Sequence, residues 1–174
     1  MREQAIFVLA VCTALTTVTS DAAGAGGARV QARGAFSFQP NQRVQGTLQW
    51  HDGEQSVRSG DRLTIVSADE VPGEPHIFTV VGADEQPKTL DELFSGSTCH
   101  TCRAALAVHD ENLDGKPPFV DVVPAGQDGL DAIGDSFLLD DGVTLTQRVT
   151  APSGTTLHFI CSIHNEMQGV LHVT

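Results

Sequence analysis

A thiol, an imidazole and a thioether stand close together near the end of the chain, at Cys161, His164 and Met167. They follow the alternating segment 156–161, so they lie where a β-strand would end and a loop begin. Two nitrogen ligands and a thiolate, with a weak thioether on the axis, form the trigonal site of electron-transfer copper proteins. The second imidazole must come from elsewhere, and His76 offers it. The residue types therefore predict a mononuclear copper site made by these four side chains.

The same residues have a second interpretation, because cysteine and methionine near a chain end often serve only as core packing. Side chains alternate between the two faces of a strand, so Leu157, Phe159 and Cys161 share the face that points toward an interior. His158 falls on the opposite face, and we therefore exclude it from the site. An inward thiol followed directly by a histidine and a methionine favours metal ligation over packing.

The first 25 residues have the pattern of a secretory signal peptide and its processing region. Arg2 precedes an apolar run at 5–15, and small residues follow. The run is too short for a secure membrane span. A bacterial lipoprotein signal is the alternative, and Cys12 would then carry a lipid anchor. Both interpretations predict a protein that is secreted, periplasmic or attached to the outer face of the cell envelope.

Removal of the signal leaves an odd number of cysteines, Cys99, Cys102 and Cys161. An unpaired cysteine is a liability in an oxidising compartment unless it has a chemical role, and a copper-bound thiolate at Cys161 supplies one. Cys99 and Cys102 leave three interpretations open. A disulfide suits an exported protein, and a second metal site would add His100 or His109. A redox-active dithiol would lack the βαβ pattern of thioredoxins.

The chain is acidic, with a formal net charge of −12 at pH 7. Nucleic-acid binding depends on basic side chains that neutralise phosphates, so this balance argues against it. It favours a basic redox protein as partner, and acidity that only keeps the protein soluble is the alternative. The partner would dock over Ile163 and His164. The candidates for steering it are acidic residues of one stretch, namely Asp128, Asp131, Asp135, Asp140 and Asp141.

Short alternating or β-branched segments, separated by Gly, Pro and Asp turns, predict an all-β fold. Many short strands of this kind are typical of an antiparallel Greek-key β-sandwich. The expected strands are 35–38, 46–50, 62–66, 76–81, 144–149, 156–161 and 169–173.

The middle of the chain differs from this pattern. The segments 87–94 and 102–109 have helical spacing, and 126–141 is acidic and loop-like. The length suits one domain with extras. The predicted organisation is a signal and processing region at 1–25, a flexible leader at 26–34, and a single domain at 35–174 with a partly helical insert at about 82–136.

Two stretches resemble the cupredoxins, the small blue copper proteins that include plastocyanin, pseudoazurin and amicyanin. The segments 57–65 and 75–78 look like the family's strand, turn and first copper histidine. The segment 141–173 looks like its last two strands and ligand loop, and the short gap between His164 and Met167 is similar to that of amicyanin. The resemblance covers about half of the chain.

The resemblance implies a cupredoxin-like sandwich in which His76, Cys161 and His164 are the strong equatorial ligands of one type 1 copper and Met167 is the long axial ligand. It implies a one-electron carrier that cycles between Cu(II) and Cu(I), not an enzyme. The alternative is a copper-binding or delivery protein in which copper is cargo, because thiolate and thioether also suit Cu(I). Ile77 departs from the family, which often has asparagine directly after the first histidine, so other groups must orient the loop.

Overall fold

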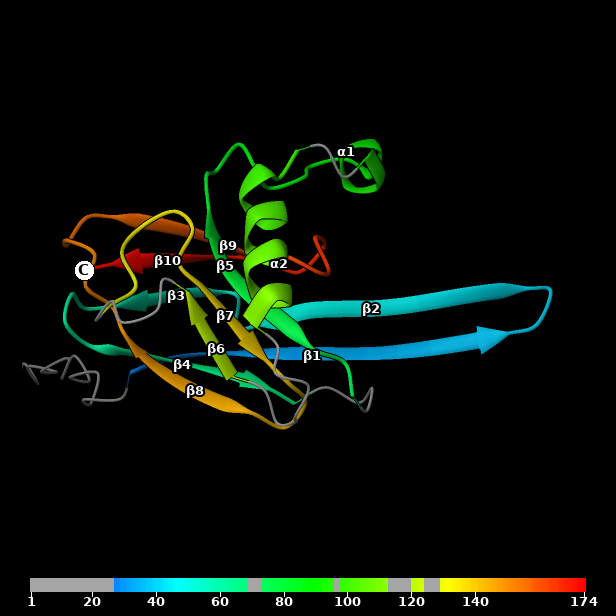
Figure 1. Ribbon diagram of the computed structural model, residues 1–174, viewed down its shortest axis with the longest axis horizontal. Coiled ribbons are helices and arrows are strands. Elements are labelled where there is room, and N and C mark those ends of the chain that lie inside the picture. The colour runs from blue at the N-terminus through cyan, green and yellow to red at the C-terminus, as the bar shows by residue number, and fades with distance from the viewer. Residues whose placement is uncertain (1–26, 69–72, 96–97, 113–119, 124–128) are drawn as a thin grey trace, which may run out of the picture.

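Two β-sheets pack face to face (Figure 1). The structure is a computed structural model that describes residues 27–68, 73–95, 98–112, 120–123 and 129–174. The four-stranded sheet, in the order β2-β1-β4-β8, consists of β1 (Ala28–Gln39), β2 (Arg43–His51), β4 (Arg62–Ser67) and β8 (Thr144–Arg148). The six-stranded sheet, in the order β3-β10-β9-β5-β7-β6, consists of β3 (Glu54–Val57), β5 (His76–Val81), β6 (Val120–Val123), β7 (Ser136–Leu139), β9 (Thr156–Cys161) and β10 (Gln168–Val173).

Large apolar side chains from alternate strand positions fill the space between the sheets. Val30 and Leu63 of the first sheet meet Phe78, Phe159 and Leu171 of the second, and all five are fully buried. Each such side chain contributes about 1.5–3 kcal/mol through removal of its apolar surface from water. The inward face predicted for the last two strands is confirmed, since alternate residues of β9 and β10 are buried.

The predicted cupredoxin-like β-sandwich with a helical insert in the middle of the chain is confirmed by this arrangement. Most neighbouring strands are antiparallel, as expected. Two pairs are parallel instead, β1 with β4 and β3 with β10. Each parallel pair joins segments that are distant in sequence, so the N-terminal strands complete both sheets.

The longer helix of the insert, α2 (His100–Asn112), covers the outer face of the six-stranded sheet (Figure 1). Ala105 packs there against Ile77 of β5 and Leu138 of β7. Because the core covers its other face, β5 is buried along its whole length. The insert therefore shields the strand that begins with the first predicted ligand.

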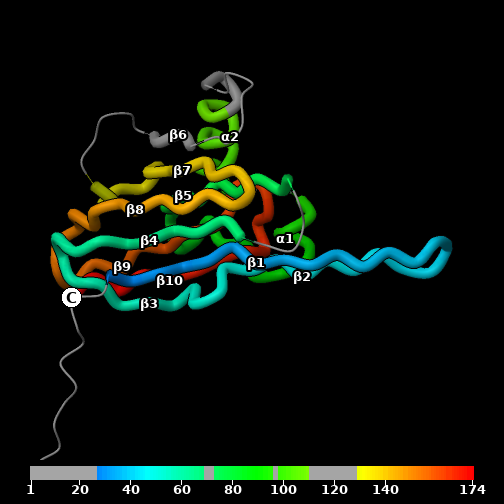
Figure 2. The backbone as a smooth tube through the Cα atoms, turned by 90° about the horizontal axis from the view of Figure 1, so that it is seen from below, coloured from blue at the N-terminus to red at the C-terminus, as the bar shows by residue number. Residues whose placement is uncertain are grey.

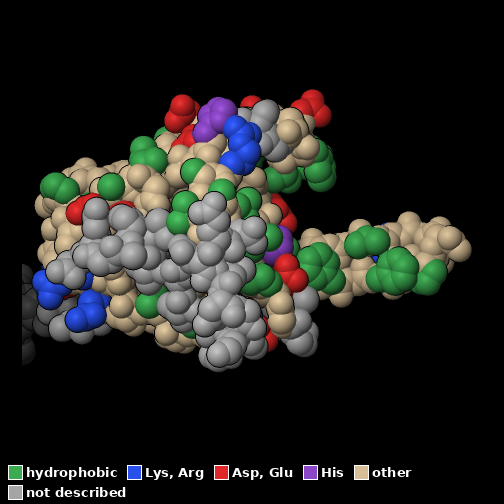
Figure 3. All heavy atoms as spheres, in the orientation of Figure 1, with side chains coloured by type: hydrophobic (Ala, Val, Ile, Leu, Met, Phe, Trp, Pro, Cys, Tyr) green, Lys and Arg blue, Asp and Glu red, His purple; other side chains and the backbone are tan. Residues whose placement is uncertain are grey.

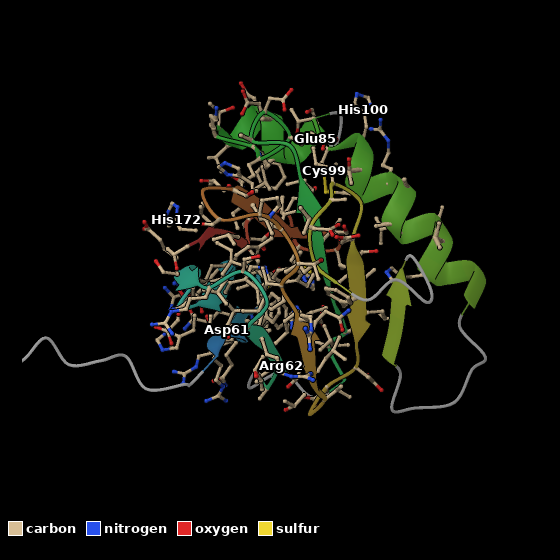
Figure 4. All side chains as sticks on the ribbon, turned by 90° about the vertical axis from the view of Figure 1, so that its left-hand side faces the viewer. Asp61, Arg62, Glu85, Cys99, His100 and His172 are labelled. Atoms are coloured by element: carbon tan, nitrogen blue, oxygen red, sulfur yellow. A yellow bond between two sulfur atoms is a disulfide. The ribbon has the colours of Figure 1, made fainter. Side chains whose placement is uncertain are left out.

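A disulfide joins Cys99 and Cys102 at the start of α2, near Glu85 (Figure 4). It packs against Ile160 of β9, and so ties the helix to the outer face of the sheet. Glu85 accepts hydrogen bonds from the amide and hydroxyl of Thr101, which satisfies a free amide of the first helical turn. Of the three interpretations of this cysteine pair, the disulfide is confirmed.

The shorter helix, α1 (Leu90–Ser95), begins with a capping box. The Thr89 hydroxyl accepts a hydrogen bond from the amide of Glu92, and the Glu92 carboxylate accepts one from the amide of Thr89. Helices are thus present in both segments where the sequence predicts helical spacing, with bounds shifted by a few residues.

The prediction of a flexible leader at 26–34 is wrong, because β1 begins at Ala28. Val30 and Ala32 are fully buried, and β1 pairs with β4 from Ala28 to Ala32. The segment alternates with the period of a strand, but its small alanine side chains give a weak signal beside the neighbouring glycines. The folded domain therefore includes residues before 35.

The prediction that 126–141 is a loop is wrong in part, since β7 lies fully buried between β5 and β6 within it. The short strands β3 and β6, of four residues each, were not predicted. The signal peptide, Cys12 and the segment 113–119 fall outside the described residues, so the signal and lipid-anchor interpretations stay predictions. None of the described helices is long and apolar enough to cross a membrane.

The strands β1 and β2 continue past the end of the sandwich as a two-stranded hairpin (Figures 1 and 2). The pairing of β1 with β4 ends at Ala32, whereas its pairing with β2 runs on to Gln39. At the hairpin turn Asn41 has a φ of 59°, in the left-handed region that asparagine tolerates. We call residues 35–47 the hairpin arm.

Candidate metal centre

Two neighbouring strands bring the first histidine and the cysteine together. β5 begins at His76 and β9 ends at Cys161. The strands are antiparallel, and their register pairs Phe78 with Cys161. His76 and Cys161 therefore lie at the same end of the sheet. Residues two apart in a strand share a face. His76, Phe78 and Cys161 therefore all point into the sandwich, where each is fully buried.

The loop at 162–167, which we call the ligand loop, brings His164 to the same point. The Nδ1 atom of His76 lies 3.8 Å from the Sγ of Cys161, and the Nδ1 of His164 lies 3.7 Å from it. All three donor atoms lie within 4.8 Å of one another. Across the described ranges, no other three His, Cys, Asp or Glu side chains converge in this way.

These separations suit a metal ion in the plane of three donors. Bonds of about 2.0–2.3 Å, the lengths that zinc forms with nitrogen and sulfur, put trigonal donors roughly 3.5–4 Å apart. Two imidazoles and a thiolate are also the donor set of a type 1 copper site. The residues present therefore fit a copper ion in both type and spacing.

Met167, the predicted axial ligand, is fully buried in the same core cluster as Cys161. Its amide donates to the carbonyl of His164, and its carbonyl accepts a hydrogen bond from the amide of Cys161. These two bonds close the ligand loop tightly between the strands. The structure thus brings all four predicted ligands to one end of the sandwich, and their binding of a metal stays a prediction.

Side-chain amides fix the backbone of the ligand loop. Asn165 donates to the carbonyls of Cys161 and Ser162. Gln168 donates to the carbonyls of Asn165 and Pro87, so the loop is also tied to the insert. Such bonds hold the ligands in place before a metal arrives, which is what a precise binding site requires.

A buried pair of hydroxyls supports the ligand loop beside Ile77. The hydroxyls of Thr79 and Ser162 lie 2.7 Å apart. The amide of Ser162 also donates to the carbonyl of Ile77. The sequence predicts that other groups must orient the loop, and these contacts between β5 and the residue after Cys161 do so.

An acidic side chain contacts the outer nitrogen of His164. The Oε1 of Glu74 lies 2.8 Å from the Nε2 of His164. A carboxylate accepts hydrogen bonds, so Nε2 carries the proton and donates it, which leaves the lone pair on Nδ1 facing Cys161. The His164 side chain is 14 % exposed, whereas the three other predicted ligands are fully buried. Sequence reasoning missed Glu74, although it lies two residues before His76.

Burial raises the pKa of the Cys161 thiol to about 11, and hydrogen bonds from backbone amides such as that of His164 oppose the rise only in part. In the metal-free protein the thiol is therefore protonated at neutral pH. Binding of a metal at Sγ must displace this proton, since the thiolate is the form that ligates metals.

Aromatic rings surround the cluster on its inner side. The ring of Trp50 lies 6.0 Å from that of His76, and also contacts Phe78 and Phe159. The rings of Phe78 and Phe159 are stacked at 4.5 Å. The sequence analysis did not single out Trp50. The signal that could have found it is the alternation of β2, which places the chain's one tryptophan on an inward position.

The remaining histidines singled out by the sequence lie away from this cluster. His158 is half-buried on the other face of β9 and contacts Gln86, which confirms its exclusion. His109 is buried in α2 and contacts the hydroxyl of Ser136. His100 is exposed beside Arg103 (Figure 4).

The acidic stretch proposed for steering is divided between the two ends of the sandwich. Asp135 is buried and accepts hydrogen bonds from the amides of Asp131 and Ala132, so its role is to hold a turn. Its backbone carbonyl accepts a hydrogen bond from the amide of Val80, which lies at the opposite end of β5 from His76. Asp141 instead contacts the amide of Gly73, on the side of the predicted ligands. Asp128 falls outside the described residues.

Several solved structures are similar to this chain. Auracyanin from Roseiflexus castenholzii is 20% identical over 87% of this chain and 99% of its own, with a TM-score of 0.44. A purple cupredoxin from Nitrosopumilus maritimus is 12% identical over 84% and 99%, with a TM-score of 0.43. Auracyanin A from Chloroflexus aurantiacus is 16% identical over 86% and 100%, with a TM-score of 0.44. No protein-family model and no curated protein sequence matches the chain. Identity and TM-score are low throughout, so the assignment of the site rests on its own donor residues.

Proposed function

From a cupredoxin-like sandwich that buries histidine, cysteine and methionine at one end, we propose that this protein is an exported blue copper protein that carries single electrons. His76, Cys161 and His164 would be the strong ligands, with Met167 on the axis. The observation that carries the proposal is the convergence of two imidazole nitrogens and one thiol within 4.8 Å. A copper ion bound there supplies the Cu(II)/Cu(I) couple.

The protein's contribution is to fix the positions of the ligand atoms and to exclude water from them. The ligand loop is fixed by the Asn165 and Gln168 amides, and the hydroxyl pair of Thr79 and Ser162 fixes its first residue. Trp50 and its neighbouring rings keep water from the inner side. Donors that do not move between oxidation states suit electron transfer, because little rearrangement accompanies each step. His164, the most exposed of the four, offers the shortest route to a redox partner.

A delivery protein, in which copper is cargo, is the competing function. Delivery calls for ligands that a receiving protein can reach and replace. Cys161, His76 and Met167 are fully buried, and only His164 reaches the surface. Burial of the thiol therefore favours a resident metal and a carrier over a delivery protein.

Two features support the proposed location outside the cytoplasm. The predicted signal peptide is one. The disulfide between Cys99 and Cys102 is the other, because such bonds persist in oxidising compartments. The surviving thiol of Cys161 is then protected by burial and by its metal.

The test is the visible spectrum of the protein after titration with Cu(II). We expect one copper per chain and an intense charge-transfer band from the copper–thiolate bond. Cys161→Ser should abolish the band, and His164→Ala should weaken copper binding. His158→Ala, a histidine outside the cluster, is the matched control and should leave the spectrum unchanged. A colourless Cu(II) complex of the unmodified protein would refute the proposal.

A second measurement separates the carrier from the delivery protein. The copper-loaded protein is mixed with an excess of a Cu(I) chelator, and release is followed with time. Slow release together with rapid one-electron oxidation and reduction supports a carrier. Complete release within the mixing time would support delivery instead.

A further inference from the structure

The hairpin arm continues the core face of the four-stranded sheet into open space. Leu48 and Trp50 of β2 point into the sandwich and are buried. Beyond Gly46, the next side chain on the same face of the arm is Val44, which is 72 % exposed. On β1 the same face carries Phe36 and Phe38, which are 51 % and 69 % exposed.

The register shows that these three side chains form one surface. Phe38 pairs with Val44 across the hairpin, and Phe36 pairs with Gly46. The Phe36 ring lies against Gly46, where a Cβ would meet its edge at 2.6 Å. The opposite face of the arm carries polar side chains such as Ser37 and Gln45. Hydrophobic atoms accordingly gather along the arm in Figure 3.

A protruding two-stranded arm of this kind is expected to pack against another surface. A two-stranded hairpin by itself is marginally stable in water, and stability requires a third strand or packing on an apolar face. Among the described strands, β1 pairs only with β2 from Ala35 to Gln39. A contiguous apolar patch that protrudes from a soluble domain marks an interaction site.

A second uncovered apolar surface lies at the same end of the molecule. The helix α1 exposes Leu90 and Phe94, at 70 % and 82 % of their surface. These residues are four apart and so lie on one face of the helix. Figures 1 and 2 place α1 at the end of the sandwich from which the hairpin arm projects.

The charges of the two surfaces are complementary. The arm itself carries one charged side chain, Arg43, and neither aspartate nor glutamate. The chain as a whole has 22 acidic and 10 basic residues. Asp91 and Glu92 lie in the first turn of α1, beside its apolar face. An apolar arm whose one charge is positive and an apolar helix with two acidic residues in its first turn fit each other when two copies meet.

We propose that the protein forms a two-fold symmetric dimer in which the hairpin arm of each copy packs on α1 of the other. Two-fold interfaces use the same patch on both subunits, so residue i contacts residue j and j contacts i. The apolar face of the arm in one copy then covers the apolar face of α1 in the other copy, and the reverse contact covers the remaining two surfaces. The proposal goes beyond electron transfer and does not depend on bound copper.

The test is the mass of the purified protein in solution, measured by light scattering after size-exclusion chromatography at micromolar concentrations. We expect a dimer with and without copper. Phe36→Ser with Phe38→Ser should raise the dissociation constant about 30-fold or more, as loss of central apolar anchors does. Leu90→Ser with Phe94→Ser should act in the same way. Gln39→Ser with Gln45→Ser, on the polar face of the same strands, is the matched control and should leave the dimer intact.

Mixing the two weakened variants tests which surfaces meet. In a mixed dimer the intact arm of one chain meets the intact α1 of the other, so dimers should reappear at concentrations where each variant alone is monomeric. An unchanged dimer of the Leu90→Ser, Phe94→Ser variant would point to arm-to-arm pairing and overturn the proposal. Failure of the mixture to dimerise, or a monomeric wild-type protein, would overturn it as well. The arm lies outside the sandwich, and Trp50 fluorescence with thermal unfolding verifies that both variants fold. Hydrogen exchange at residues 35–47 should slow as the wild-type concentration rises.

Discussion

The Oε1 of Glu74 lies 2.8 Å from the Nε2 of His164, on the side of the ring away from the Nδ1 that faces Cys161. One carboxylate thus holds the orientation and the tautomer of the most exposed predicted ligand. A hydrogen bond of this kind also increases the basicity of the imidazole, because a carboxylate withdraws the ring proton toward itself. A more basic ligand favours Cu(II) over Cu(I).

Glu74→Gln should therefore raise the reduction potential while copper stays bound. Loss of such a partner typically weakens metal binding by about 10–100-fold. If Cu(II) binding falls tenfold more than Cu(I) binding, the potential rises by about 59 mV. Voltammetry and competitive copper titration measure the two effects. Glu166→Gln, an exposed glutamate of the ligand loop, is the control, and an equal shift there would assign the effect to net charge.

Met167→Leu should keep copper bound and raise the reduction potential, because the axial ligand tunes the couple more than it holds the metal. Met167 is fully buried in the core, and leucine replaces it with little change in volume. Voltammetry with copper analysis gives both readouts. Loss of copper as complete as in Cys161→Ser would make Met167 a primary ligand and contradict the trigonal arrangement.

Thr79→Val should destabilise the metal-free protein by about 1–3 kcal/mol, because it leaves the buried Ser162 hydroxyl without its partner. Thr79→Val combined with Ser162→Ala removes both hydroxyls and should cost less than the sum of the single changes. Urea unfolding gives the free energies. The exposed hydroxyl pair of Thr64 and Thr146 is the matched control, and Thr64→Val should cost little. Equal losses at the two pairs would show that burial of the hydroxyls is irrelevant.

The metal-free protein should lose stability as the pH rises from about 9 to 11. Cys161 has a folded pKa of about 11 against an ordinary value of 9.0, because burial disfavours the thiolate. Its contribution is complete below pH 9, and it is lost as the pH rises through 11, by roughly 2–3 kcal/mol in total. The chain has no tyrosine, and its lysines are Lys88 and Lys116, so few other groups titrate in this range. Urea unfolding at several pH values should show the loss, and Cys161→Ser should remove it.

Alkylation without reduction should leave Cys99 and Cys102 unmodified, because they are joined in a disulfide. Mass spectrometry of the peptides decides this. Cys161 in the unfolded protein is the internal control, since it should react fully. Alkylation at both positions of the pair would contradict the disulfide.

The sequence by itself predicted which residues form the candidate site. A cysteine, a histidine and a methionine at spacings of three follow a strand, and local chemistry of this kind does not depend on distant contacts. Strand alternation was equally informative, because a period of two fixes which face each side chain takes. It placed Cys161 inside and excluded His158, and both are confirmed.

Tertiary structure decided everything that depends on which segments become neighbours. The pairing of Phe78 with Cys161 brings His76 to the thiol, and the positions of Glu74 and Thr79 follow from the same register. β1 was predicted as a leader because its small side chains give a weak local signal, yet pairing with β4 makes a strand of it. The acidic stretch looked continuous in sequence, but β7 separates Asp135 from Asp141 by the length of a strand. The type of a residue and its place in a strand determine its chemistry and the face it takes. The packing of strands that are distant in sequence determines which other side chains lie close enough to act with it.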